Sequence, residues 1–128
     1  MTVHIVKLGS ARGPREGLRI GTVRRPPRGV ARAQYGARNF YDVWLPILSP
    51  SPALVSAALS AKDAKAWTLF ARKFTAEMRR PDASRTLDLL AALSSSANFS
   101  VGCYCEDELR CHRSILRNLL IERGAQVR

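Results

Sequence analysis

The C-terminal stretch from Phe99 to Arg123 constrains the fold more than any other part of this chain. An apolar run over 99–104 predicts a strand, and a helix-like pattern over 114–123 follows it. The end of this run and the connection that follows it, 101–113, contain all three cysteines of the chain and one of its two histidines. The sequence therefore predicts a turn from a strand into a helix. In open α/β sheets ligands bind at such turns, because the carboxyl end of the strand and the free N–H groups of the helix meet in one crevice.

The rest of the chain predicts further strands and helices around this unit. Alternating apolar and polar residues predict strands at 3–8, 18–23 and 41–45, in addition to 99–104. Helices are expected from Pro52 to about Leu59, from Asp63 until Pro81, from Asp82 or Ala83 into the serines at 94–96, and from about Cys111 to Arg123. Early strands, central helices and a terminal strand-loop-helix unit indicate a small three-layer α/β domain with a mostly parallel or mixed sheet.

The length and the cysteine content limit the class of protein. We expect 128 residues, 46% of them hydrophobic, to form one domain over 1–128, with a basic N-terminal third (1–38) and a motif-bearing segment (99–124). No stretch approaches the roughly 20 apolar residues of a membrane helix, and we expect no signal peptide, because the apolar run in 1–12 is short and interrupted. Three crowded cysteines do not match the paired framework of a secreted protein. We therefore expect reduced thiols, a cytoplasmic protein and no membrane partner, with the oligomeric state left open.

Positive charge is concentrated in the N-terminal third. Residues 1–38 contain nine basic residues and one acidic residue, within a formal net charge of +11 for the chain. The proline-rich loop 24–29 holds Arg24, Arg25 and Arg28 in an extended segment. Because guanidinium groups form paired hydrogen bonds to phosphoryl oxygens, these arginines are candidates for binding an anion. A solvated basic face without a partner has the same composition and is the alternative.

The segment Val101–Arg113 is the candidate chemical site, and the first hypothesis for it is an anionic, phosphate-like or nucleotide-like ligand. The N–H groups at the start of the last helix would hold the ligand. A thiolate near a helix N-terminus and an imidazole has a lowered pKa, which makes a cysteine here a candidate nucleophile. The catalytic candidates are Cys105, Glu106, Cys111 and His112, and the ligand-binding candidates are His112, Arg113, Arg24, Arg25 and Arg28. Whether the protein is an enzyme stays open at this point.

Two other interpretations of the same segment remain. Cys103, Cys105, Cys111 and His112 are four residues of the types that bind zinc. Their spacing argues against a metal, because neighbouring residues project about 100° apart on a helix and structural zinc sites use two separated ligand pairs. Zinc is therefore the less favoured cofactor hypothesis. In the other interpretation the cysteines are small buried apolar residues, and the histidine and arginine bond to nearby loops.

The segment Cys103–Leu116 resembles a known family. Its cysteine, glutamate and Cys-His-Arg motif, together with the run 41–46, the prolines at 50 and 52 and the helix 70–78, is similar to the YeaO-like proteins, domain of unknown function family 488. The similarity covers about 20–125. It implies a small bacterial or archaeal α/β domain whose biochemical activity is not established. By the same resemblance the site residues are Cys105, Glu106, Cys111, His112 and Arg113, with Arg24, Arg25 and Arg28 as a second group.

Two classes of function are consistent with these features. In a ligand-binding protein or enzyme, the loop 24–28 and the turn 105–113 converge on one pocket for a phosphorylated or carboxylated small molecule. In a nucleic-acid-binding module, the N-terminal arginines spread over a convex face and follow a phosphate backbone. Aromatic residues among these arginines could stack on bases, although core packing is favoured for them. A concave pocket lined by both segments would favour the first class.

Overall fold

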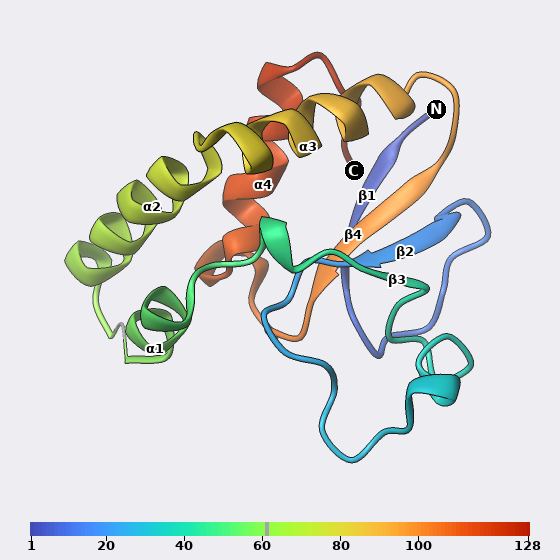
Figure 1. Cartoon of the computed structure of the whole chain (residues 1–128), viewed down its shortest axis with the longest axis horizontal. Coiled ribbons are helices and arrows are strands. Elements are labelled where there is room, and N and C mark those ends of the chain that lie inside the picture. The colour runs from blue at the N-terminus through green and yellow to red at the C-terminus, as the bar shows by residue number, and fades with distance from the viewer. Residues whose placement is uncertain (61) are drawn as a thin grey trace.

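A parallel β-sheet forms the centre of the protein (Figure 1). The computed structural model describes residues 1–60 and 62–128, and within these ranges the sheet has four strands. They are β1 (Val3–Lys7), β2 (Leu18–Gly21), β3 (Val43–Trp44) and β4 (Phe99–Cys103). The order is β1-β4-β2-β3 and every pairing is parallel, so the last strand along the chain lies between the first two. The expected α/β class is confirmed, with a parallel sheet.

The described part of the chain contains four α-helices, which begin where the sequence provides suitable first residues. The side chain of Asp63 accepts a hydrogen bond from the backbone nitrogen of Ala66 at 2.7 Å and so caps the second helix. Pro81 occupies the first turn of the third helix, where its missing N–H costs nothing. The helices are α1 (Pro52–Ser60), α2 (Ala64–Met78), α3 (Pro81–Leu93) and α4 (His112–Glu122), and the short 3-10 helices are η1 (Arg32–Gln34), η2 (Pro46–Leu48) and η3 (Glu108–Arg110).

Apolar side chains on one face of the sheet pack against the helices. Since alternate residues of a strand point to the same face, Phe99 and Val101 of β4 share this face with Ile20, the partner of Val101 on β2. These side chains join the main core with Phe74 of α2 and Leu116 of α4. In Figure 1 the four labelled α-helices gather on this side of the sheet. Burial of this face supplies the main stabilisation of the fold, through the hydrophobic effect.

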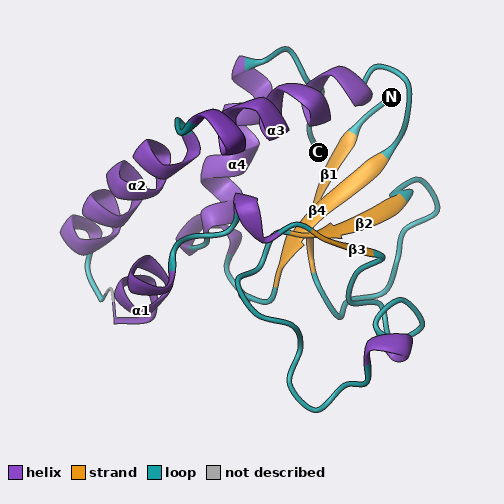
Figure 2. Ribbon diagram, in the orientation of Figure 1, coloured by secondary structure: helices purple, strands orange, loops and turns teal. Residues whose placement is uncertain are grey.

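Loops cover the opposite face of the sheet (Figure 2). Arg19 of β2 and Ser100 of β4 point toward this side and are both 0% exposed. The Arg19 guanidinium forms an ion pair with Glu16 at 3.0 Å, and it donates to the backbone oxygens of Ser10 and Asn39 at 2.8 and 2.6 Å. The hydroxyl of Ser100 donates to the backbone oxygen of Glu16 at 2.9 Å. The buried ion pair of Arg19 and Glu16 therefore fixes the loops to this face of the sheet, and loops take the place of a second layer of helices there.

Gly21 of β2 allows the segment that carries Tyr41 to approach this face of the sheet closely. A Cβ atom on Gly21 would lie 2.3 Å from the ring of Tyr41, which is nearer than real Cβ contacts come. Tyr41 belongs to a second cluster of buried residues that also contains Leu8, Cys103 and Cys111. This cluster connects the loop face of the sheet to the cysteine-rich segment.

The boundaries of several elements differ from the expected ones, and β1 and β4 each end one residue earlier than expected. The strand expected at 41–45 is reduced to β3, because Pro46 lacks a backbone N–H and begins η2. The strand expected at 18–23 ends at Gly21, although the nitrogen of Thr22 still donates to Gly102 at 3.0 Å. The last helix begins at His112. Across the described residues, no helix combines the length and the apolar character that crossing a membrane requires.

Candidate functional site

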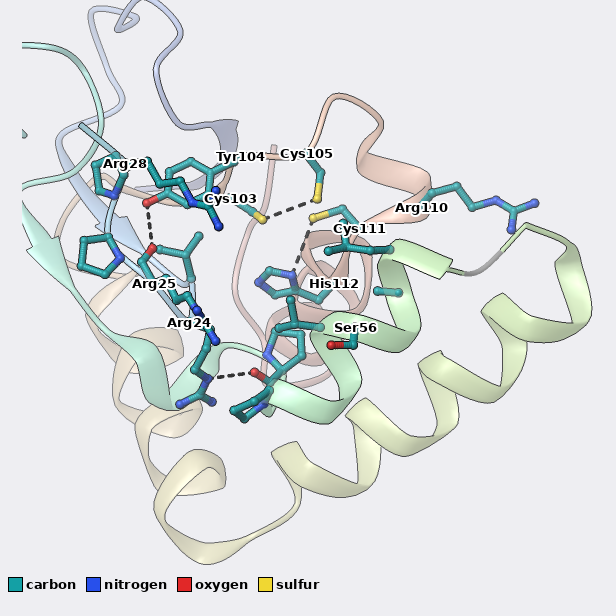
Figure 3. A pocket seen from close by; sticks show the side chains of 18 of the residues that line it. Arg24, Arg25, Arg28, Ser56, Cys103, Tyr104, Cys105, Arg110, Cys111 and His112 are labelled. Atoms are coloured by element: carbon teal, nitrogen blue, oxygen red, sulfur yellow. Dashed lines mark hydrogen bonds between the residues drawn. The ribbon is translucent and has the colours of Figure 1, made fainter. Parts of the chain in front are cut away.

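The cysteine-rich segment forms the corner between β4 and α4, as the sequence predicts. β4 ends at Cys103, the chain passes through η3, and α4 begins at His112. Cys111 precedes this helix as its N-cap, with an extended backbone of φ −130° and ψ 150°. Figure 3 shows that the side chains of Cys103, Cys105, Cys111 and His112 point toward one another. The corner therefore gathers three sulfur atoms and one imidazole in a single group, called the Cys-His cluster below.

Thr22 orients the imidazole of this cluster. The Nε2 atom of His112 lies 2.6 Å from the backbone oxygen of Thr22. Because a carbonyl oxygen only accepts hydrogen bonds, Nε2 carries the proton and Nδ1 of the neutral ring has the free lone pair. Nδ1 lies 3.7 Å from Sγ of Cys111. The ring is 6% exposed and packs edge-to-face against Phe74, with the ring centroids 5.4 Å apart.

The three cysteines differ in their exposure. Cys103 and Cys111 are buried, whereas Cys105 is exposed. The sulfur atoms of Cys103 and Cys105 are 3.7 Å apart. The ligand atoms of Cys103, Cys111 and His112 all lie within 4.8 Å of one another. None of the three forms a disulfide in this structure, and their reduced state in solution stays a prediction.

The electrostatics of the cluster favour one thiolate, at Cys111. Hydrogen bonds from Cys103 and Cys105 lower the pKa of the Cys111 thiol, and the nearby His112 lowers it further, against the effect of burial. Hydrogen bonds with the other two sulfurs raise the pKa of Cys103, and burial adds to this. For Cys105 the contact with Cys103 lowers the pKa, but the contact with Cys111 and burial together raise it. Cys111 is therefore the thiol whose ionisation this arrangement favours most.

The Cys-His cluster lines a pocket of about 620 Å³ (Figure 3). The other walls come from the loop 23–28 and from α1. The apolar part of the lining includes Phe40, Val55, Leu59 and Phe70. Two segments that lie far apart in the sequence, and that both contain predicted site residues, therefore meet at one cavity.

The charge of this pocket is positive. Its lining includes Arg24, Arg25, Arg28 and Arg110 and, among the described residues, no aspartate or glutamate. Arg24 is held by hydrogen bonds to the backbone oxygens of Pro50 and Ser49, at 3.0 and 3.3 Å. Arg110 extends away from the cluster and donates to a backbone oxygen at 3.3 Å. The guanidinium groups of Arg25 and Arg28 are exposed and have no hydrogen-bond partner within 1–60 and 62–128.

Two of the residues singled out from the sequence lie outside the lining. Arg113 is 3% exposed, and its Nη2 donates to the backbone oxygen of Cys105 at 2.7 Å. Glu106 is exposed and forms an ion pair with Lys7 of β1, and the hydrogen bond from Lys7 lowers the pKa of this carboxyl. Both side chains hold the corner in shape. The ligand-binding role of Arg113 and the catalytic role of Glu106 stay predictions.

Some residues of the site were not singled out from the sequence. Arg110 lies within the motif and is basic, so its charge was an available signal. Thr22 acts through its backbone oxygen, an atom that every residue type has, so the sequence gives no signal for it. The hydroxyl of Tyr104 donates to the backbone oxygen of Arg25 at 3.0 Å and so ties the arginine loop to the end of β4. Contacts of this kind join distant segments and have no local sequence pattern.

The fold and the corner define a class: a small parallel α/β protein with a Cys-His cluster at the carboxyl end of an interior strand. A family model described as the active DUF488-N3 subclade matches residues 3–124. The chain therefore belongs to the DUF488 family, which confirms the resemblance noted from its motif. Neither the curated proteins nor the solved structures contain a match to it.

Proposed function

We propose that the protein binds an anionic small molecule, phosphate-like or nucleotide-like, in the pocket beside the Cys-His cluster. The observation that carries the proposal is the charge of the lining, which has four arginines and no carboxylate among the described residues. Cavities lined by one sign of charge with low-dielectric walls concentrate ions of the opposite sign. Arg25 and Arg28 are the residues whose guanidinium groups are free to form paired hydrogen bonds to such an anion.

The loop that carries these arginines is held in place by contacts within the chain. Tyr104 bonds to the backbone of Arg25, and Arg24 is anchored on Pro50. The consecutive prolines of the loop restrict its backbone further. A loop that is already ordered loses less conformational entropy when a ligand binds, so these contacts favour affinity.

The apolar walls favour an organic anion over a bare inorganic ion. A volume of about 620 Å³ lies within the ordinary range of small-molecule sites. Phe40, Val55 and Phe70 present apolar surface beside the arginines. A ligand that combines a phosphate or carboxylate with a base, ring or acyl group would cover this surface and gain hydrophobic stabilisation.

Catalysis at the cluster is the finer part of this proposal. Cys105, Cys111 and His112 line the same pocket as the arginines, so an anion bound there lies next to them. Three of the four catalytic candidates from the sequence thus face the proposed ligand. Reaction at these residues stays a prediction.

A nucleic-acid-binding module is the alternative, and the distribution of the arginines supports it less well. Arg32 and Arg38 are exposed on the loop that carries η1. Arg12 and Arg19 form ion pairs with Asp42 and Glu16 instead. The arginines of the basic N-terminal third are therefore divided between ion pairs within the chain, the pocket and the surface. Binding a nucleic-acid phosphate backbone needs one continuous basic face.

The proposal is tested by measuring how ligands shift the melting temperature and how tightly they bind. We expect a mononucleotide or another phosphorylated organic anion to raise the melting temperature of the full chain. The double variant Arg25→Gln/Arg28→Gln should weaken binding by about tenfold or more, since it removes two charge-assisted hydrogen-bonding groups.

The matched control is Arg32→Gln/Arg38→Gln, which removes the same charge outside the pocket and should leave the affinity within about twofold. Equal losses in both double variants would contradict the pocket. Binding of random-sequence DNA that falls steeply with salt, and falls further in the control variant, would favour the nucleic-acid module.

A further inference from the structure

We infer that Cys103, Cys111 and His112, completed by Cys105, form a binding site for one zinc-class divalent metal ion. This inference goes beyond the proposed anion pocket and does not depend on it. Its starting observation is that one ligand atom from each of Cys103, Cys111 and His112 lies within 4.8 Å of the other two. Thiolate sulfur and imidazole nitrogen together select zinc over magnesium, calcium or manganese.

The spacings suit a tetrahedral site. With a zinc–sulfur distance of about 2.3 Å and a zinc–nitrogen distance of about 2.0 Å, neighbouring ligand atoms lie about 3.5 to 3.8 Å apart. The distance from Sγ of Cys111 to Nδ1 of His112 is 3.7 Å, and the distance from Sγ of Cys103 to Sγ of Cys105 is also 3.7 Å. Two pairs of ligand atoms therefore already have the separation that one ion would impose.

The imidazole is oriented as it is in metal sites. A metal-bound histidine usually donates its other ring N–H to a carbonyl or carboxylate, which sets the tautomer and the direction of the free lone pair. Nε2 of His112 makes this bond to the backbone oxygen of Thr22 at 2.6 Å. Nδ1 is left facing Cys111. Thr22 is itself fixed just after β2, where its hydroxyl donates to the backbone oxygen of Gly102 at 2.9 Å.

The adjacency of Cys111 and His112 is no obstacle in this fold. The sequence argument against a metal assumed that both residues lie on the helix, about 100° apart. Cys111 is the N-cap of α4 and has an extended backbone, so its side chain does not follow the rotation of the helix. The two residues can therefore point into one space, as Figure 3 shows.

Hydrogen bonding within the cluster leaves a role for an ion. Three thiols are donors, and Nδ1 of His112 is the one strong acceptor that faces them in the described part of the chain. Thiols otherwise donate only weakly to one another. A cation would bind the sulfur lone pairs and the Nδ1 lone pair together. Cys105, the exposed member, lines the pocket and would close the side of the ion that faces it.

The test measures zinc in the full chain, purified with reductant, loaded with Zn²⁺ and dialysed against metal-free buffer. We expect about one zinc per chain, and a thiolate-to-metal absorption band when Co²⁺ replaces it. Cys111→Ser and Cys103→Ser should lower the affinity by at least about tenfold. Cys105→Ser should keep three ligands and lose zinc to a chelator faster than the parent. His4→Gln, which changes the histidine outside the cluster, should bind zinc as the parent does.

Several results would overturn the site. One is a parent protein that keeps less than about a tenth of an equivalent of zinc per chain after dialysis. Another is a Cys111→Ser variant that binds zinc as tightly as the parent. A third is native mass spectrometry that finds a disulfide in place of bound zinc. Loss of zinc from Cys105→Ser at the parental rate would remove Cys105 from the ligand set. If the cysteine variants do not fold, alkylation of the native parent decides. Its thiols should resist iodoacetamide until a chelator is added, and equal rates with and without chelator would contradict the site.

The anion pocket and the metal site fail separately. Arg25→Gln/Arg28→Gln should keep its zinc, because neither arginine is a ligand. Loss of anion binding with zinc retained would therefore reject the proposed function alone. Absence of zinc in a parent protein that binds nucleotides would reject the metal site alone.

Discussion

His112 bonds through Nε2 to the backbone oxygen of Thr22 at 2.6 Å, across a sequence separation of 90 residues. The bond joins the first residue of α4 to the chain just after β2. It decides which ring nitrogen faces the cysteines. The chemistry of the corner therefore depends on a backbone group from a different part of the sheet.

Removal of this imidazole should destabilise the fold as well as the site. In His112→Ala the Thr22 oxygen loses its donor and Phe74 loses its edge-to-face partner. We expect the free energy of unfolding in urea to fall by about 2 to 4 kcal/mol, with chelator present so that metal binding does not contribute. His4→Ala, on β1 and only partly buried, should cost less. Equal costs would show that the Thr22 bond is energetically unimportant.

Arg19 should be the most costly arginine of the N-terminal third to replace. Arg19→Met keeps the apolar stem but leaves Glu16 and the oxygens of Ser10 and Asn39 without their buried donor. Loss of one partner of a buried ion pair costs about 3 to 5 kcal/mol. Arg15→Met, at an exposed position of the same segment, should change the free energy of unfolding by less than about 0.5 kcal/mol. Similar denaturation midpoints for the two variants would contradict this prediction.

Asp42 should make stability depend on pH in the acid range. The hydrogen bond from Arg12, with further contributions from the Arg19 amide and nearby charge, lowers the pKa of this carboxyl in the folded protein. A carboxyl with a lowered folded pKa stabilises the fold above its unfolded value near 3.9, and this contribution is lost as pH falls through the folded pKa.

Melting temperatures between pH 6 and pH 3 test this dependence. Asp42→Asn should reduce the loss of stability on acidification, because the titrating group is gone. Glu16, whose pKa is also lowered in the fold, contributes in the same direction and should leave a residual dependence. Glu122→Gln, at an exposed carboxyl of α4, should follow the parental profile. A parental profile in Asp42→Asn would show that this ion pair does not contribute.

Gly21 should not accept a side chain. In Gly21→Ala the new Cβ meets the ring of the buried Tyr41 at 2.3 Å, and either the strand or the loop must move. Overpacking of this kind costs about 1 to 3 kcal/mol. Gly36→Ala is the matched control, because its Cβ would have only one contact below 4 Å, at 3.3 Å from Asp42. Equal melting temperatures in the two variants would be inconsistent with the close approach of Tyr41 to β2.

Most secondary-structure elements could be predicted because their signals are local. The helical stripe with Phe70 and Phe74, the cap at Asp63 and the proline at 81 all act within one helix. Strand lengths were less predictable, because they depend on the partner strand. Val43 and Trp44 form a strand only where they pair with Ile20 and Gly21 of β2. The parallel order of the sheet depends on contacts between strands that are up to about 100 residues apart in sequence, such as Val3 with Phe99.

Part of the candidate site could also be predicted. The three cysteines and His112 lie close together in the sequence, and a strand-to-helix turn keeps them close in space. A ligand-binding role is predicted for Arg113, and the structure buries this side chain with a hydrogen bond to the backbone oxygen of Cys105. Burial of a charged residue depends on whether its neighbours can satisfy the guanidinium group, and a sequence pattern does not contain that information.

The sequence by itself determined the class of the fold, the corner between the last strand and the last helix, and the chemical groups available there, because periodicity, capping and residue spacing act over a few residues. Only the tertiary structure decided which arginines face a shared pocket, which nitrogen of His112 faces Cys111, and which charged side chains form ion pairs within the chain. These properties arise where β2, β4, α1 and the loop 23–28 meet. Their physical cause is the geometry of non-local contacts, which requires the whole chain to be folded.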